Sequence, residues 1–99
     1  MKLTTEKNGT ELTVHLSGEL NTLTAPELGA LMDKELNGVQ SLICDFAECD
    51  YVSSAGLRVL LAAFKQISAS DGTMKLVNVG EMFMEVLQTT GLDSVFDVQ

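Results

Sequence analysis

Two adjacent serines are the residues whose type and position best support chemistry. Ser53 and Ser54 lie between an apolar run and the start of a helical pattern, so we expect their hydroxyls at the surface. One interpretation is structural, because serine is a strong N-terminal cap of helices. The other is phosphorylation, because a phosphoserine at a helix N-terminus faces unpaired backbone N–H groups and the positive end of the helix dipole. Its charge of about -1.5 to -2 would act on a docked partner and leave the fold intact.

Other reactive constellations are missing. The single histidine, His15, lies within a predicted strand, where we expect a structural or solvent-facing role. The sequence has no G-x-S-x-G frame around Ser54, no G-x-x-x-x-G-K phosphate loop and no G-x-G-x-x-G dinucleotide motif. An enzyme would need His15 or a carboxylate cluster to converge with Ser54, and the spacing gives this no support. We therefore expect a protein that is not an enzyme and binds no cofactor.

The two cysteines, Cys44 and Cys49, are spaced as C-x4-C, which with one histidine falls short of a four-ligand zinc site. We expect no metal and interpret both as small hydrophobic residues near a strand end. One pair is too few for a disulfide framework, and the N-terminus has no apolar stretch of the kind that an export signal needs. The sequence thus predicts a reduced, cytoplasmic protein.

Composition limits the partners. The 99 residues are 45% hydrophobic, and 14 acidic against 6 basic side chains give a net charge of -8. This length predicts one domain, residues 1–99, around one core. The charge disfavours nucleic acid and anionic lipid, and no segment reaches the roughly 20 apolar residues of a membrane span. We expect no nucleic acid and no direct membrane contact.

The first half of the chain predicts a hairpin, a helix and a buried strand. Strands over residues 2–6 and 11–17 are joined by a turn at Lys7-Asn8-Gly9. Thr24 and Glu27 then predict a capping box for a helix that ends before Gly38. The rest of this half is the apolar strand over residues 41–46.

The second half predicts the helix that begins at the serines, followed by a strand, a helix and a short strand. The helix starts at Ser53 or Ser54, with a core face of residues at intervals of three and four. The later elements are a strand over residues 74–79, a helix over 81–90 closed by Gly91-Leu92, and a last strand within 93–98.

The element order is therefore β-β-α-β-α-β-α-β. Strands separated by helices imply parallel neighbours with right-handed crossovers, and the opening hairpin is antiparallel. The predicted fold class is α/β, with a mixed, largely parallel sheet of four to five strands and three main helices.

Three stretches, in the right order and spacing, resemble a known family. YVSSAGLRVLLAAFKQ resembles the signature of STAS domains, the sulfate transporter and anti-sigma factor antagonist family, and the overlapping LICDFAECDYVSSAGLRVL resembles the strand-to-switch-helix unit of that family. LSGELNTLTAPEL is similar to that family's Gly-Glu-Leu-Asp segment, and TTGLDSVFDV to its C-terminal ending. The resemblance covers nearly the whole chain and falls in the subclass of stand-alone anti-sigma factor antagonists, which implies the STAS fold.

The resemblance implies a partner-switching regulator of sigma-factor-dependent transcription. In the family, the unphosphorylated antagonist binds an anti-sigma factor that is also a serine kinase, and a sigma factor is freed. The kinase phosphorylates the antagonist at the start of the switch helix, the complex dissociates, and a serine phosphatase resets the cycle. Aligning Gly56-Leu57 with the family's Gly-Leu places the acceptor on Ser54, with Ser53 as the alternative.

Two positions depart from the family pattern. Ser53 stands where the family often has Asp, and Asn21 replaces the Asp that frequently ends the Gly-Glu-Leu-Asp segment. Both changes remove a carboxylate from the expected surroundings of the acceptor. They lower the local repulsion of a phosphate, but they also put recognition by a kinase in question.

The expected partner-binding surface joins the switch-helix start to the loop at Glu19 to Thr22. For Arg58, a solvated helix position is an equal alternative. A second hypothesis keeps the fold without the switch: a STAS subunit of an ABC-type phospholipid transporter, which is not phosphorylated. The oligomeric state stays open between a monomer and a weak dimer. The surface residues are Glu19, Asn21, Thr22, Ser53, Ser54, Ala55, Gly56 and Arg58.

Overall fold

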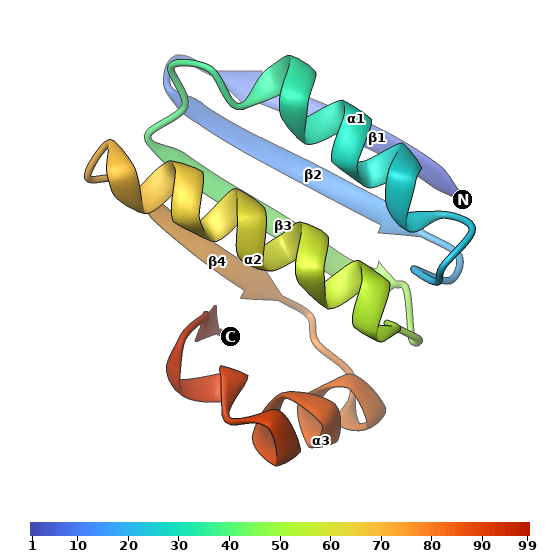
Figure 1. Ribbon diagram of the computed structural model, residues 1–99. Helices are drawn as coiled ribbons and strands as arrows, with labels where there is room; N and C mark the ends of the chain where they lie inside the picture. Colours follow the sequence, from blue (N-terminus) through green and yellow to red (C-terminus); the bar gives the residue numbers. More distant parts are fainter.

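A computed structural model describes residues 1–99, and its elements follow the order expected from the sequence (Figure 1). The chain forms β1 (Lys2–Asn8), β2 (Glu11–Ser17), α1 (Ala25–Glu35), β3 (Ser41–Glu48), α2 (Ser54–Ala69), β4 (Thr73–Val77), α3 (Glu81–Thr90), the short 3-10 helix η1 (Leu92–Ser94) and β5 (Asp97–Val98).

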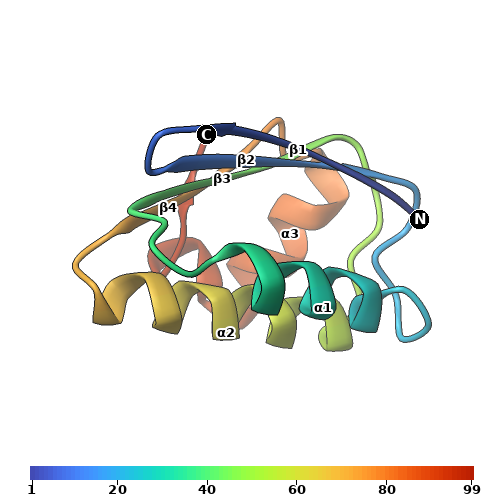
Figure 2. The ribbon, with the colours of Figure 1, turned by 90° about the horizontal axis from the view of Figure 1, so that it is seen from above.

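The five strands form one sheet in the order β1-β2-β3-β4-β5. The β1–β2 hairpin is antiparallel and all other neighbours are parallel, which confirms the predicted fold class. Figure 2 shows the sheet as one layer and α1, α2 and α3 on the same side of it. The opposite face of the sheet, called here the open face, has no helix over it.

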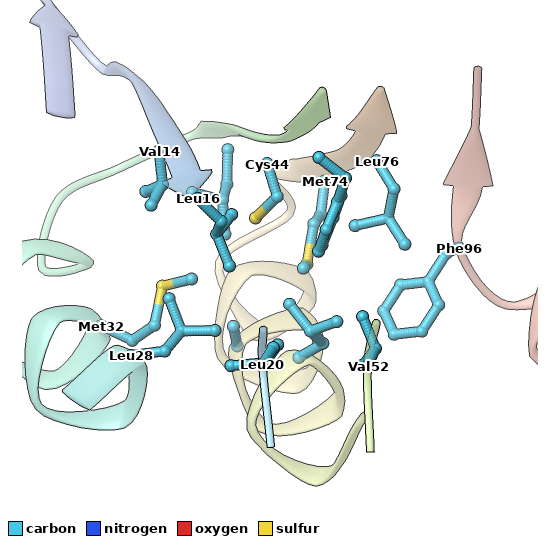
Figure 3. Packing of buried hydrophobic residues seen from close by; sticks show 14 of the residues in the cluster. Val14, Leu16, Leu20, Leu28, Met32, Cys44, Val52, Met74, Leu76 and Phe96 are labelled. Carbon is cyan, nitrogen blue, oxygen red and sulfur yellow. The ribbon is translucent and has the colours of Figure 1, made fainter. Parts of the chain in front are cut away.

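The core lies between the sheet and the helices. In β2 the alternating residues Leu12, Val14 and Leu16 are buried, as the two-residue period of a strand predicts. Figure 3 shows side chains of the strands facing Leu28 and Met32 of α1. The core cluster contains 23 buried residues, and no polar or charged residue is buried. One continuous apolar layer therefore fixes the helices on the sheet.

The hairpin turn is shorter than predicted. Asn8 pairs with Glu11, so only Gly9 and Thr10 remain in the turn, and Gly9 has a φ of +63°. The expectation that Lys7 and Asn8 lie in the turn was therefore wrong. The buried alternation of β2 sets the register of the pair, and β1 follows it for two more residues.

The predicted capping box at α1 was also wrong. Thr24 is the N-cap residue, but its side chain makes no cap hydrogen bond. The Thr24 hydroxyl instead donates to the Glu19 carbonyl at 2.6 Å and accepts from the Asn21 N–H at 2.8 Å. The Asn21 side-chain oxygen accepts from the N–H groups of Leu23 and Thr24, at 2.9 and 3.1 Å. Asn21 thus stabilises the turn that leads into the helix.

The later elements match the prediction except near the strand ends. The helix over Glu81–Thr90 is confirmed, with Gly91 as its left-handed C-cap. The strand predicted over 74–79 ends at Val77, because Asn78 adopts a φ of +57°. The last strand is only Asp97–Val98, because a 3-10 helix occupies part of the segment expected to be strand.

Candidate partner-binding site

The strand ends and helix starts meet at one edge of the molecule, called here the carboxyl edge. The parallel strands β2, β3 and β4 run in the same direction, and each leads by a loop into the N-terminus of the next helix (Figure 1). In α/β proteins, binding sites form at this end of parallel strands because the loops there are free to vary. The two predicted serines lie on this edge.

Backbone hydrogen bonds join the two loops that carry the predicted site residues. The Leu20 N–H donates to the Tyr51 carbonyl at 2.9 Å, and the Ser53 N–H donates to the Leu20 carbonyl at 2.8 Å. Leu20 and Val52 form an isolated parallel bridge between the same loops. The segment from Glu19 to Thr22 therefore lies beside the start of α2, as the sequence predicted.

Gly56 makes this close approach sterically acceptable. A Cβ atom at this position would lie 2.6 Å from Cγ of Leu20, well inside the closest contact that real Cβ atoms make. Gly56 is buried in the first turn of α2. It therefore supports the surface from beneath, and the partner-facing role expected for it does not fit its position.

The two serines have separate roles in the structure. Ser53 is the N-cap residue of α2, with extended backbone angles, and its hydroxyl oxygen accepts from the Gly56 N–H at 3.3 Å. Ser54 is the first helical residue and is exposed. Its hydroxyl takes part in none of the side-chain hydrogen bonds of the fold. The capping interpretation thus applies to Ser53, and Ser54 is left accessible.

The surroundings of Ser54 accommodate negative charge. The first turn of α2 contains no acidic residue, and the first N–H groups of a helix have no partner within it. Arg58 lies four residues further along, on the same side of the helix. Its side chain is exposed and forms no ion pair with a carboxylate. A phosphate on Ser54 would meet a favourable local field.

The remaining predicted residues lie at different depths. Glu19 and Thr22 are exposed, and Ala55 is half-buried. Asn21 is half-buried and its amide oxygen is directed at backbone N–H groups. An Asp at the Asn21 position, or a carboxylate at Ser53, could accept the same backbone hydrogen bonds. The two departures from the family pattern therefore keep the geometry and remove two negative charges.

The cysteines are buried and free. Burial raises the pKa of Cys44 to about 12. Burial, followed by the nearby carboxylates of Asp50 and Glu19, raises the pKa of Cys49. Both side chains therefore stay as neutral thiols at neutral pH, in agreement with their interpretation as small hydrophobic residues.

His15 lies away from the serines, on the open face of the sheet. Its Nδ1 is 2.7 Å from Asp45 Oδ2 and its Nε2 is 2.8 Å from Glu6 Oε2. The Asn78 side-chain amide donates to Asp45 Oδ1 at 2.8 Å. This four-residue set, called here the His15 network, does not include Ser54, so no Ser-His pair forms.

Two further features bear on the class of site. No three His, Cys, Asp or Glu side chains lie in a group that could hold a metal ion. None of the helices combines the length and the apolar character that crossing a bilayer requires.

Sequence comparisons give the family. The model of the STAS domain matches residues 2–99. BtrV of Bordetella bronchiseptica is 34% identical over 99 residues, which are 99% of this chain and 85% of BtrV. The anti-sigma-B factor antagonist of Bacillus subtilis is 29% identical over 94 residues, 94% of this chain and 85% of that protein. The chain belongs to the STAS domain family, and the resemblance found in its sequence is confirmed.

Solved structures agree on the fold. An anti-sigma factor antagonist from Mycobacterium paratuberculosis has a TM-score of 0.86 at 24% identity, covering 98% of this chain and 83% of its own. SpoIIAA in its unphosphorylated form has a TM-score of 0.75 at 19% identity, and the match covers 95% of this chain and 97% of SpoIIAA. Bacillus SpoIIAA in its phosphorylated form has a TM-score of 0.78 at 20% identity, and the match covers 99% of this chain and 91% of SpoIIAA.

Proposed function

We propose that this protein is an anti-sigma factor antagonist that is switched by phosphorylation at Ser54. In this role it binds an anti-sigma factor, itself a serine kinase, in the cytoplasm and regulates sigma-factor-dependent transcription. The observation that carries the proposal is the exposed Ser54 hydroxyl, which no hydrogen bond of the fold uses. The name of the Bacillus subtilis relative supports the partner class.

The switch follows from charge added to a rigid scaffold. Ser53 provides the helix cap, so modifying Ser54 breaks no hydrogen bond of α2. A phosphate on Ser54 adds charge without removing a contact of the scaffold. We therefore assign the effect to the docked surface, where a partner matched to the neutral hydroxyl would bury a dianion; burying a charge that gains no new partner costs several kcal/mol, and about 1.4 kcal/mol is tenfold in affinity.

The proposed site residues form two groups, those that contact the partner and those that lie beneath and support them. Ser54, Arg58 and Ala55 present the start of α2 to the partner, and Glu19 and Thr22 present the adjoining loop. Beneath them, Ser53, Asn21 and Gly56 hold the geometry. A serine phosphatase that removes the phosphate completes the cycle. We propose no catalytic role for any residue of this chain.

Mass spectrometry with matched variants tests the acceptor. The protein is incubated with its cognate serine kinase and ATP, and the modified residue is mapped. Wild type and Ser53→Asn should each gain one phosphate, because asparagine keeps the helix cap. Ser54→Ala should gain none.

Two outcomes would reject the proposal. If the Ser53→Asn variant is phosphorylated at a residue other than Ser54, the acceptor is that residue and the assignment to Ser54 is wrong. Absence of both phosphate and kinase binding in wild type would favour the transporter-subunit hypothesis, in which the same fold braces an ATPase without modification.

A further inference from the structure

An apolar hollow opens beside the switch serine on the carboxyl edge. Its volume is about 190 Å³, and it lies between the loop that precedes Ser53 and the start of α3. Five of its six lining residues are hydrophobic: Tyr51, Val52, Met82, Phe83 and Val86 line it together with Asp50. None of the residues assigned to the switch lines this hollow.

Two of the side chains that line the hollow are exposed, whereas Val52 and Phe83 at its base belong to the core. Met82 is 67% exposed and Tyr51 is 46% exposed. Leu23, in the loop that is hydrogen-bonded to Tyr51 and Ser53, is 86% exposed. The only other exposed large hydrophobic residue is Val95, beyond η1. Apolar groups gathered in this way indicate an interaction surface.

The charges at the rim are all negative. Asp50 lines the hollow, and Glu85 lines a shallower depression that continues from it along α3 and shares Met82 and Val86. Neither hollow is lined by a lysine or arginine. Electrostatic complementarity therefore calls for an occupant that is apolar at its centre and basic at its margin.

We propose that this hollow receives an apolar side chain of the anti-sigma factor, flanked there by lysine or arginine. The inference rests on the function proposed above and names the second contact of the same interface. Continuity supports it, since Tyr51 and Val52 connect the hollow directly to Ser53 and Ser54. The apolar side chain would supply affinity, and Ser54 would supply the switch.

Calorimetric titration of the purified serine kinase tests the hollow. Met82→Gln and Tyr51→Ser should each weaken binding about tenfold or more, whereas the matched control Val95→Gln should change the Kd by less than about twofold. Asp50→Asn should slow association and reduce its salt dependence. Because Met82 is exposed, Met82→Gln should keep the Tm of wild type, which separates lost binding from lost folding.

The outcomes separate the two proposals. If a phosphate on Ser54 abolishes binding but Met82→Gln and Tyr51→Ser bind as wild type does, the hollow is not part of the interface and the switch stands. If wild type does not bind the kinase, both proposals fall. If wild type self-associates and Met82→Gln prevents it, the occupant is a second copy of this chain, and the inference is overturned.

Discussion

The open face of the sheet and the carboxyl edge both carry polar side chains, yet they use these polar groups in opposite ways. On the open face, His15 lies between Glu6 and Asp45, and Asn78 completes the set, so these polar groups satisfy one another. On the carboxyl edge, the Ser54 hydroxyl has no partner within the chain. Polar groups that are satisfied internally stabilise a fold, and exposed unpaired groups next to apolar side chains are available to a partner.

The largest effect on binding is expected at Ser54, the residue of the carboxyl edge whose hydroxyl has no hydrogen-bond partner within the chain. Ser54→Asp should weaken binding of the serine kinase about 100-fold or more, since burying a carboxylate in an interface matched to a neutral hydroxyl costs several kcal/mol. Ser54→Ala should bind as wild type does and resist release, because no hydrogen bond of the fold is lost. Titration calorimetry measures both constants. Equal affinities for the two variants would remove the proposed distinction between the edge and the open face.

Gly56 tests whether the edge depends on the close approach of its two loops. Gly56→Ala should lower the free energy of unfolding by about 1–3 kcal/mol, because its Cβ would overlap Leu20. Gly29→Ala is the matched control, since its Cβ would meet nothing closer than 3.9 Å and alanine favours the helix interior. Urea unfolding measures both. A Gly56→Ala variant as stable as wild type would show that the loops separate easily.

The helix cap provides a smaller test on the same edge. Ser53→Ala should cost about 1 kcal/mol of stability, because the Gly56 N–H loses its acceptor, and Ser53→Asn should cost much less. Thermal unfolding at constant pH compares the two variants with wild type. Identical losses for alanine and asparagine would contradict a capping role for Ser53.

The smallest effect is expected on the open face, as a dependence of stability on pH. Hydrogen bonds to Glu6 and then to Asp45 raise the pKa of His15 above 6.5. Its stabilising contribution is therefore complete below pH 6.5 and is lost as the pH rises through the higher pKa of the folded protein. Because the ring is partly exposed, we expect a change below about 1 kcal/mol.

Asp45 acts in the opposite direction at lower pH. The Asn78 amide, the Ala47 N–H and His15 lower the pKa of Asp45 below 3.8. The contribution of Asp45 to the free energy of unfolding is therefore present above pH 3.8 and is lost as the pH falls through the lower pKa of the folded protein.

Urea unfolding between about pH 5 and pH 9 isolates the loss of stability that comes from His15, which His15→Gln should remove. Retention of this loss in His15→Gln would assign it to another group.

The two surfaces also differ in how well the sequence predicted them. The carboxyl edge was predicted because local signals define it: an apolar run, two serines and a helical period place Ser53 and Ser54 between a strand and a helix. The turn after α3 was predicted for the same reason, since Gly91 is a local signal for a left-handed cap.

The capping box failed for a local reason, because Glu19 and Asn21 in the preceding turn engage the Thr24 hydroxyl. The two features that were missed altogether depend on contacts between distant segments. The His15 network was missed because the register that places Asp45 beside His15 is set between parallel strands and has no local sequence signal. The apolar hollow was missed because it forms only when α3 packs beside the loop before α2.

The central claim is that a phosphate on Ser54 releases the partner and leaves the scaffold unchanged. Its most direct test is to phosphorylate the wild-type protein stoichiometrically, then measure its Kd for the serine kinase and its Tm beside those of the unmodified protein. We predict a Kd at least about 100-fold higher with an unchanged Tm. An unchanged Kd, or a loss of binding accompanied by a collapse of the Tm, would contradict the claim.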